Sequence, residues 1–584
     1  MTSVRARVAR SLPCVQWMSD YDRERCASDL IAAMIVTVLL IPQSLAYAMI
    51  AGVPAEVGLY ASILPLIVYA LLGSSRTLSV GPVAVISLMT AMALNDVAQN
   101  GTVSYLLAAS TLAFLSGGIL LAFGALRMGF IANFISHSVI SGFITASGVL
   151  IAFNQVQHLM GVQSEGGTIS EILPSLFGTV QHANSATIAL GVSVLIMLVL
   201  VRAYAIKSMA FLGLSERGAS LLAKVAPMII IIGSLLAVFM LDLTAEGVAV
   251  VGSIPSGLPQ IAISMPDMSL IQALLFPACL ISVIGYVESV SVGKTLAAKR
   301  QQKINPNQEL VALGASNLAA GLSGAFPVTG GFSRSVVNFD AGALTQAASL
   351  YTAVGIAACA LFLAPSLYYL PKAALAATII VAVLSLVDLN ILKKTWSTSK
   401  SDFLAVMITI VLTLSSGVEV GVASGIAVSI ALHLYRTSRP HIAEVGLVPG
   451  SEHFRNVRHY RVETLPHVLA VRMDESLFFA NASYLEDWVS GKVFENDRIA
   501  HVVLMCSAIN EIDYSAVETL EQMNEIFKSQ GVQLHLSEVK GPVLTTLKRH
   551  EFLKHLSGRP FLSQFEAHRQ LAHASVHQAI EKDQ

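Results

Sequence analysis

The middle of the sequence has very little charge. Residues 30–435 hold 29 Lys, Arg, Asp and Glu side chains in 406 positions, whereas the other 178 positions hold 44. Soluble domains contain about 25% charged residues, so the middle is excluded as a soluble fold. A hydrocarbon core about 30 Å thick requires about 20 apolar residues per helix, and the middle supplies such runs repeatedly. We therefore expect a polytopic membrane protein.

Several chemical signals are also missing. The five cysteines lack CxxC spacing, so they indicate neither a disulfide framework nor a thiolate metal site. The formal net charge is −1 and no block of Lys and Arg occurs, so nothing favours nucleic acid as a partner. Gly293-Lys294-Thr295 lacks the earlier glycine of a phosphate-binding loop, and hydrolase motifs are absent. We expect no cofactor, no metal and no enzymatic activity.

What the sequence does contain is fourteen apolar segments in two sets of seven, separated by the polar stretch 242–270. The first set is 30–51, 57–73, 82–95, 103–125, 129–154, 184–203 and 225–241. The second set is 271–296, 308–325, 332–341, 345–364, 373–388, 403–416 and 418–435. With the N-terminus inside, the inner loops carry twelve Lys and Arg and the outer loops only Lys372, as the positive-inside rule requires. Both termini are then cytoplasmic, and the odd number of spans makes the halves inverted repeats, which are typical of secondary transporters.

Two of these segments, 82–95 and 332–341, are too short to span a membrane. Each is third in its set, and each follows a helix-breaking stretch, Ser79-Val-Gly-Pro82 or Pro327-Val-Thr-Gly-Gly331. Such short segments at matching positions indicate a transporter's binding site. A half-helix that begins inside the membrane presents unpaired N–H groups and a partial positive charge. Two such ends would form an anion site, and two kinked structural helices are the alternative.

Two charged residues fall deep inside otherwise neutral segments, where a charge is costly and indicates function. Arg334 lies at the start of the second half-helix, where its guanidinium suits an oxyanion. Glu288 lies in the middle of segment 271–296, and a buried carboxyl can exchange a proton near neutral pH. The alternatives are that Arg334 is a structural partner of a buried acid, or that the two residues form a fixed salt bridge.

The character of the chain changes after residue 435. Residues 468–472, 502–505 and 532–536 are predicted strands, and 515–530 and 541–550 are predicted helices, which indicates a small α/β domain. The predicted organisation is an N-terminal cytoplasmic segment, a seven-helix repeat, a connecting segment, a second repeat, a linker, the α/β domain and a tail. Their respective bounds are 1–29, 30–241, 242–270, 271–435, 436–454, 455–570 and 571–584.

The motifs resemble those of the sulfate permease (SulP) family of anion transporters. The resemblance rests on Pro42-Gln43-Ser-Leu-Ala-Tyr47-Ala48, on residues 79–89 and 331–338 as the starts of the third and tenth helices, and on a C-terminal module similar to a STAS domain. It implies an α-helical polytopic fold of fourteen segments, arranged as uracil-permease-like 7+7 inverted repeats with core and gate domains. It also implies a homodimer and an elevator movement of the core against the gate.

The resemblance also implies site residues. The anion would lie between the third and tenth helix starts, close to Gln43, Tyr47, Val83, Ser333 and Arg334. Proton-coupled relatives carry a glutamate where Glu288 stands. Val292 offers no oxygen to a cation, which disfavours sodium. In the STAS module, Ser515 takes the place of a serine that is phosphorylated in stand-alone relatives, although a plain helix cap explains the same residues.

These observations predict a secondary active transporter of inorganic oxyanions in the cell (inner or plasma) membrane, with sulfate and protons as the partners. Alternatives are an electroneutral chloride, bicarbonate or sulfate exchanger, and a bicarbonate or dicarboxylate transporter. A more remote one is a membrane-anchored sensor whose STAS module recruits a cytoplasmic partner.

Overall fold

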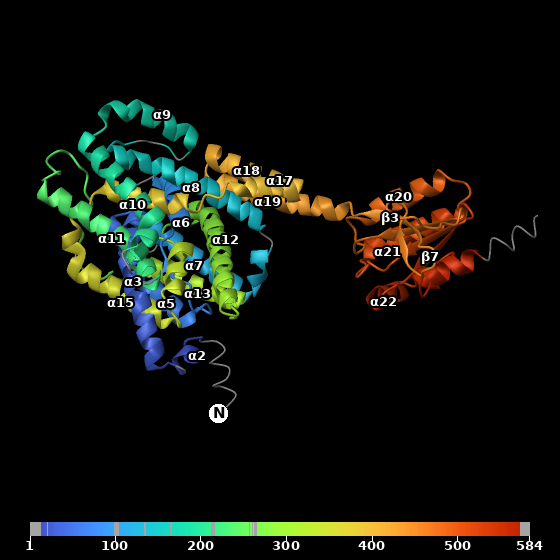
Figure 1. Cartoon of the computed structure of the whole chain (residues 1–584). Helices are drawn as coiled ribbons and strands as arrows, with labels where there is room; N and C mark the ends of the chain where they lie inside the picture. The colour runs from blue at the N-terminus through green and yellow to red at the C-terminus, as the bar shows by residue number, and fades with distance from the viewer. Residues whose placement is uncertain are drawn as a thin grey trace, which may run out of the picture. The chain divides into compact units, whose positions relative to one another are not determined.

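A computed structural model describes residues 13–19, 21–98, 104–133, 136–163, 166, 168–211, 216–255, 257–259, 261 and 266–572. The chain divides into two compact units between Ser429 and Ile430. The first unit is helical, and the second contains a mixed sheet (Figure 1). We describe each unit by itself.

The first half of the helical unit contains ten α-helices before the connecting segment, within the described residues. They are α3 (Arg23–Ile50), α4 (Ala55–Tyr60), α5 (Leu64–Leu72), α6 (Ala84–Ala98), α7 (Tyr105–Ala125), α8 (His137–Met160), α9 (Ile169–Thr179), α10 (Ser185–Phe211) and α11 (Glu216–Met240), preceded by the short α2 (Pro13–Ser19). The two-residue strand β1 (Val80–Gly81) lies between α5 and α6.

The second half follows the same pattern. Its helices are α12 (Met268–Lys299), α13 (Pro306–Leu322), α14 (Phe332–Asp340), α15 (Ala347–Ala358), α16 (Lys372–Leu384), α17 (Asn390–Thr398), α18 (Lys400–Ser416) and α19 (Val418–Ser438). A two-residue strand, β2 (Thr329–Gly330), precedes α14, as β1 precedes α6. The short third element of each half is thus a strand followed by a helix.

Every predicted apolar segment contains a helix, but not every one of these helices is long enough to span a membrane. In the described part of the chain, eight helices are long and apolar enough to cross a membrane, and three more apolar helices are shorter. The segment predicted at 129–154 differs most, because a 3-10 helix occupies Met128–Asn133 and α8 begins only at His137. The Gly129 N–H donates a hydrogen bond of 2.8 Å to Oδ1 of Asn307, and this bond fixes the 3-10 helix against α13. The count of fourteen spans therefore stays a prediction.

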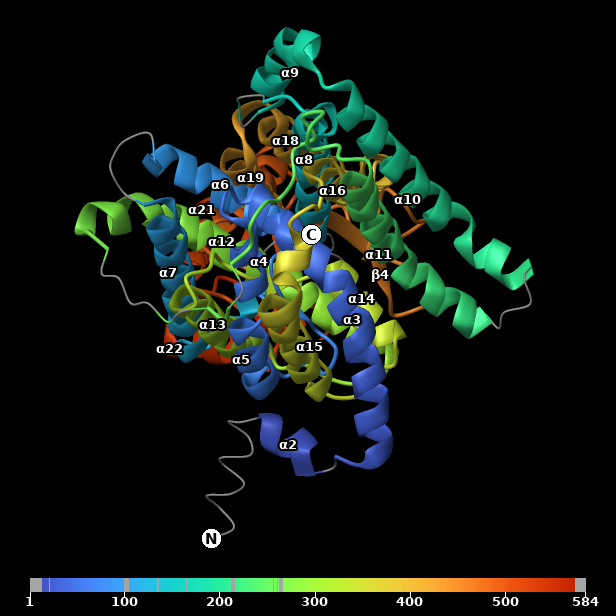
Figure 2. The ribbon, with the colours of Figure 1, turned by 90° about the vertical axis from the view of Figure 1, so that its left-hand side faces the viewer.

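The two halves are interleaved. Helix α3 lies beside α15, and α7 lies beside α13, although each pair is separated by about two hundred residues or more (Figure 2). Small residues allow this approach: a Cβ added to Gly117 on α7 would lie 2.8 Å from the Gly314 carbonyl oxygen on α13. The main core runs through both halves, so the broken elements are held inside a packed scaffold.

The second unit contains a six-stranded sheet in the order β4-β3-β5-β6-β7-β8. The strands are β3 (Ile442–Leu447), β4 (Phe454–Asn456), β5 (Val468–Met473), β6 (His501–Met505), β7 (Gln533–Ser537) and β8 (Pro560–Phe561). Strands β5 to β8 are parallel, and β3 is antiparallel to β5. The helices are α20 (Ala482–Phe494), α21 (Tyr514–Ser529), α22 (Gly541–Arg549) and α23 (Phe552–His555).

This unit confirms the predicted α/β class and adds elements that the sequence pattern did not reveal. The three predicted strands correspond to β5, β6 and β7, and the two predicted helices correspond to α21 and α22. Strands β3, β4 and β8 are edge or near-edge strands, half exposed or only two to three residues long. Such strands carry too weak an apolar alternation to be identified from sequence.

Candidate functional site

The two interrupted segments meet at a short β-ribbon in the interior of the helical unit. Val80 pairs with Gly330 and Gly81 pairs with Thr329, in an antiparallel register. Both strands are buried, and α6 and α14 begin within three residues of them. The starts of two half-helices, one from each repeat, are thereby brought to the same place.

Residues of the second repeat fix the backbone that leads into β1. The Ser79 N–H donates to Oγ of Ser335 at 3.0 Å, and the Gly331 N–H donates to the Ser79 carbonyl at 3.1 Å. Nδ2 of Asn338 donates to the Thr77 carbonyl at 3.1 Å. These buried bonds hold the two helix starts in a fixed relationship.

Arg334 lies at this crossing and is only 2% exposed. Its Nε donates to the Ser79 carbonyl and its Nη2 donates to the Thr329 carbonyl, both at 2.9 Å. Nη1 is buried and has no hydrogen-bond partner among the described residues. The guanidinium is thus oriented by both strands and keeps donor capacity for an anion, which suits its planar fork.

Two glycines form the cradle of this guanidinium. A Cβ on Gly81 would lie 2.8 Å from Nη1 of Arg334, and a Cβ on Gly331 would lie 2.6 Å from its Nε. Gly331 is also the N-cap of α14 and has no side chain to satisfy the N–H groups of the first turn. The partial positive charge of a helix start is therefore added to the full charge of Arg334.

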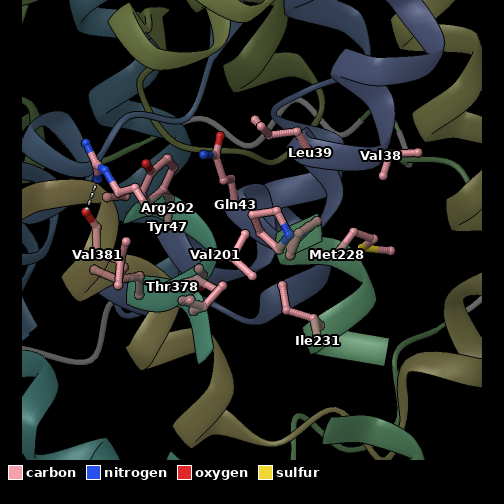
Figure 3. A pocket seen from close by; sticks show the side chains of 16 residues that line it. Val38, Leu39, Gln43, Tyr47, Val201, Arg202, Met228, Ile231, Thr378 and Val381 are labelled. Carbon is pink, nitrogen blue, oxygen red and sulfur yellow. Dashed lines mark hydrogen bonds between the residues drawn. The ribbon is translucent and has the colours of Figure 1, made fainter. Parts of the chain in front are cut away.

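Gln43 and Tyr47, one turn apart on α3, line a cavity of about 210 Å³ (Figure 3). Its other walls come from α10, α11 and α16, and they are mostly apolar. Arg202 of α10 also lines it, and its Nη1 donates to the Val381 carbonyl at 2.9 Å. Helix α14 packs against α3, but Arg334 does not line this cavity.

Glu288 of α12 faces a different cavity, of about 460 Å³, which it lines with Lys294 and Phe332. Phe332 is the first residue of α14, so this cavity reaches the start of the second half-helix. Glu288 forms no ion pair within 4.0 Å with Arg334, although the structure describes both side chains. The salt bridge considered from the sequence is thus not formed in this conformation.

The remaining predicted site residues flank the crossing. Val83 is buried, and its carbonyl accepts the Ser87 N–H at 2.9 Å at the start of α6. Ser333 is exposed, between Phe332 and Arg334. Val83, Ser333 and Arg334 therefore lie at the two helix starts, and none of the three lines the cavity of Gln43 and Tyr47.

Two buried acids were not singled out by sequence reasoning. Glu309 is fully buried and accepts hydrogen bonds from the Tyr69 hydroxyl at 2.8 Å, the Ser74 N–H at 2.8 Å, the Ser74 hydroxyl at 2.6 Å and the Ser75 N–H at 3.1 Å. Asp29 is fully buried and accepts from the Leu344 N–H at 2.7 Å and the Thr345 hydroxyl at 2.5 Å. Both lie in the first turns of helices or close to them, where an acid indicates only a helix start.

Asp29 also shows where helix α3 begins relative to the predicted segments. It falls in the segment predicted to be cytoplasmic, 1–29, but α3 already begins at Arg23 and carries Asp29 into the interior. The N-cap is Asp22, whose carboxylate accepts the Arg25 N–H at 2.8 Å. The helix thus starts at its cap, ahead of the first apolar run.

Ser515 lies exposed in the first turn of α21. Asp513 is the N-cap, and its carboxylate accepts the Ala516 N–H and the Phe479 N–H, both at 2.9 Å. The cap is therefore provided by Asp513, and a regulatory role for Ser515 stays a prediction.

Two broken elements that meet in a helical unit whose halves share one order of elements, followed by an α/β domain, define a class of membrane transporter. Comparison with known families agrees: residues 26–409 match the sulfate permease family, and residues 459–567 match the STAS domain. The chain belongs to the sulfate permease family. At the level of the family, it is a membrane anion transporter.

Curated relatives align over most of the chain. The chain is 35% identical to "Sulfate transporter 4.1, chloroplastic" of Arabidopsis thaliana, over 92% of this chain and 79% of that protein. It is 30% identical to "High affinity sulfate transporter 2" of Stylosanthes hamata, over 91% of this chain and 81% of that protein.

Solved structures share the fold. The overall structure of SLC26A9 matches with a TM-score of 0.88 at 23% identity, covering 100% of this chain and 95% of that one. The transmembrane domain of the cyanobacterial bicarbonate transporter BicA matches with a TM-score of 0.59 at 20% identity, covering 69% of this chain and 98% of that one. These similarities confirm the predicted membrane fold.

Proposed function

We propose that this protein is a secondary active transporter that takes up sulfate together with protons across the cell membrane. The observation that carries the proposal is the buried Arg334 at the start of α14, which is fixed by two backbone carbonyls and whose Nη1 has no hydrogen-bond partner in the described part of the chain. A tetrahedral oxyanion suits a fork of donors beside helix N-termini. The relatives named as sulfate transporters support sulfate as the anion.

The anion site in this proposal comprises Gln43, Tyr47, Val83, Ser333 and Arg334. Glu288 couples the anion to a proton, because it lines a cavity with Phe332 at the start of α14 and forms no ion pair within 4.0 Å with Arg334. Protonation of Glu288 would remove a negative charge close to the anion site and so favour anion binding.

Movement in this proposal is of the elevator type. The ribbon and its two half-helices would move as one body, because buried hydrogen bonds join Thr77 and Ser79 to Asn338 and Ser335. The cavity beside Gln43 and Tyr47 lies where α3 faces α10, α11 and α16, so these helices would form the opposing surface. We further propose a homodimer with both termini cytoplasmic and the domain bounds given by the sequence.

Uptake of labelled sulfate into proteoliposomes tests the proposal. We expect uptake that rises with an inward proton gradient and needs no counter-anion inside the vesicle. A strict need for internal chloride, bicarbonate or sulfate would favour the exchanger instead. Uptake of bicarbonate or a dicarboxylate, but not of sulfate, would show that the substrate is not sulfate. No flux of any anion would favour the membrane-anchored sensor.

A further inference from the structure

The second unit contains a cavity of about 990 Å³ that the transport proposal does not use. It lies between the end of α19, strand β3, the segment after β4, and α20, all within residues 433–492. Four cationic side chains line it, together with two aromatic ones on α20. They are Arg436, Arg439, Arg458, Lys492, Tyr484 and Trp488.

The cavity has an excess of positive charge, and its four cationic side chains form no ion pairs with the described residues. None of the four cations lies within 4.0 Å of a carboxylate of the described residues. Arg439 lies over the ring of Tyr435, 5.3 Å from its centroid. Two carboxylates that line the cavity, Glu444 and Glu475, have no ion pair there, so four cations face two acids.

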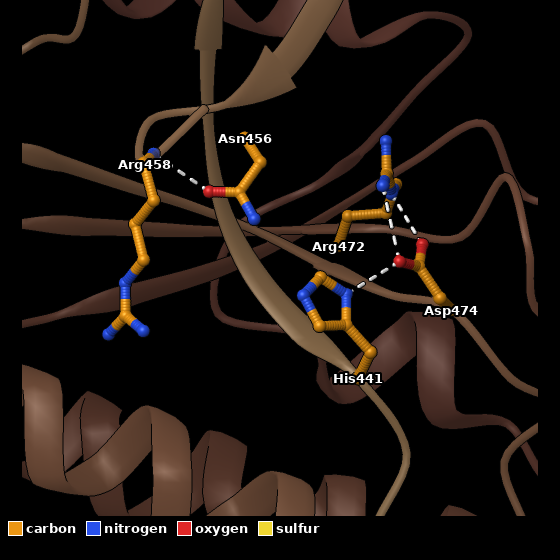
Figure 4. A network of polar contacts seen from close by, with 5 residues as sticks. All are labelled: His441, Asn456, Arg458, Arg472 and Asp474. Carbon is orange, nitrogen blue, oxygen red and sulfur yellow. Dashed lines mark hydrogen bonds and ion pairs between the residues drawn. The ribbon is translucent and has the colours of Figure 1, made fainter. Parts of the chain in front are cut away.

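A third carboxylate, Asp474, is already neutralised. It accepts from Nε of Arg472 at 2.6 Å and lies 2.8 Å from Nδ1 of His441 (Figure 4). Burial opposes ionisation of Asp474, but its hydrogen bonds to Arg472 and His441 outweigh this and lower its pKa. Figure 4 also shows the Arg458 guanidinium directed away from this group, while the Arg458 N–H donates to Oδ1 of Asn456 at 2.9 Å.

The position of the cavity in the chain indicates the source of its ligand. Helix α19 has the length and apolarity of a membrane span, and its last turns supply Arg436 to the cavity. Arg439 follows the helix directly. Basic residues next to the end of a membrane helix meet the anionic headgroups of the leaflet, and Trp and Tyr also favour that depth.

We propose that this cavity binds the phosphate of an anionic phospholipid headgroup. Arginine forks bind phosphate oxygens in a bidentate manner, and Lys492 adds a point charge. Tyr484 and Trp488 are half-buried and offer apolar surface and polar edges beside the phosphate. The proposal is independent of transport, because it uses no residue of the anion site.

Binding of lipid to the full-length protein tests this proposal. The protein in detergent micelles is titrated with dioctanoyl phosphatidylglycerol and, in parallel, with dioctanoyl phosphatidylcholine, by calorimetry. We expect phosphatidylglycerol to bind about tenfold tighter, and R458Q and K492Q each to weaken it about fivefold, the value of one basic residue at a membrane surface. R498Q is the matched control, because Arg498 is exposed in the same unit and does not line the cavity.

We expect both variants to fold, because Arg458 is exposed and Lys492 is partly exposed. Thermal unfolding of each variant checks this. A third titrant, inorganic pyrophosphate, separates a lipid from a soluble phosphate. Equal affinity for the two lipids, or equal losses in R498Q and R458Q, overturns the proposal. Pyrophosphate binding that depends on Arg458 and Lys492 without selective phosphatidylglycerol binding also overturns it, because the source would then be soluble.

Discussion

The guanidinium of Arg334, in the second repeat, occupies the space that a side chain at Gly81, in the first repeat, would need. A methyl group on Gly81 would lie 2.8 Å from Nη1 of Arg334. The same nitrogen is the one that has no partner among the described residues. Gly81 therefore leaves room for the donor that the proposed anion needs, and it ties the first broken element to the charge of the second.

Replacing this glycine should disturb the anion site. We expect Gly81→Ala to displace the Arg334 guanidinium and to lower sulfate affinity by about 5- to 100-fold, because overpacking costs about 1–3 kcal/mol. Gly118→Ala on α7 is the control, since a Cβ there meets nothing within 4 Å. Concentration-dependent sulfate uptake measures both. An unchanged affinity in Gly81→Ala would show that this nitrogen does not contact the anion.

The charge of Arg334 should matter more than its volume. Arg334→Gln removes a charge-assisted donor, so we expect sulfate affinity to fall about 10- to 100-fold. Lys393→Gln, an exposed position on α17, should leave uptake unchanged. Binding of labelled sulfate to purified protein measures the effect, and equal affinity in Arg334→Gln and the unsubstituted protein would move the site elsewhere.

Glu288 should govern the response to a proton gradient. We expect Glu288→Gln to bind sulfate but to lose stimulation by an inward proton gradient, because an amide cannot exchange a proton. Uptake is compared in proteoliposomes with and without the gradient, and sulfate binding is measured separately. Normal stimulation in Glu288→Gln would exclude this residue as the coupling group.

Glu309 should determine stability, because its carboxylate joins α13 to the backbone that leads into β1. Glu309→Gln disrupts a set of four accepted hydrogen bonds from Tyr69, Ser74 and Ser75. We expect a loss of about 2–4 kcal/mol in the free energy of unfolding. Glu246→Gln is the control, since Glu246 is exposed. Thermal unfolding in detergent measures the difference, and equal midpoints would contradict the role.

The STAS domain contains a histidine pair that should make its stability depend on pH. The Arg559 N–H donates to Nδ1 of His535 at 3.1 Å, which leaves Nε2 of His535 to donate to Nδ1 of His501 at 3.1 Å. Burial, followed by the charges of His501 and Arg559, lowers the pKa of His535 from 6.5 to about 4. Because the unfolded chain binds this proton more readily, stability is complete above pH 6.5 and falls as the pH drops towards 4.

We expect this loss to be on the order of 2 kcal/mol once solvent screening is allowed for. His535→Gln should weaken the pH dependence, whereas His459→Gln, an exposed position, should retain it. Hydrogen exchange of the β7 amides in the full-length protein, corrected for the intrinsic rate at each pH, measures the effect. An identical pH dependence in His535→Gln would exclude this histidine as the cause.

The sequence predicted the interrupted segments well but not what joins them. Helix-breaking residues and short apolar runs located both broken elements, because backbone propensities are local. The antiparallel pairing of Val80 with Gly330 joins residues 250 positions apart, and no local pattern contains it. The same limit explains Asp29 and Glu309, which have the sequence signature of ordinary helix starts and become buried acceptors only through partners from the other repeat.

The amino-acid sequence by itself determined the membrane class, the two sets of apolar segments, the α/β domain and the family, because apolar runs, charge placement and motifs are properties of adjacent residues. Tertiary structure decided which groups meet. It left Glu288 and Arg334 without an ion pair within 4.0 Å, placed Gln43 and Tyr47 on a cavity that Arg334 does not line, and left Nη1 of Arg334 without a hydrogen-bond partner among the described residues. These relationships between side chains depend on how the two repeats pack against each other, and packing is a property of the whole fold.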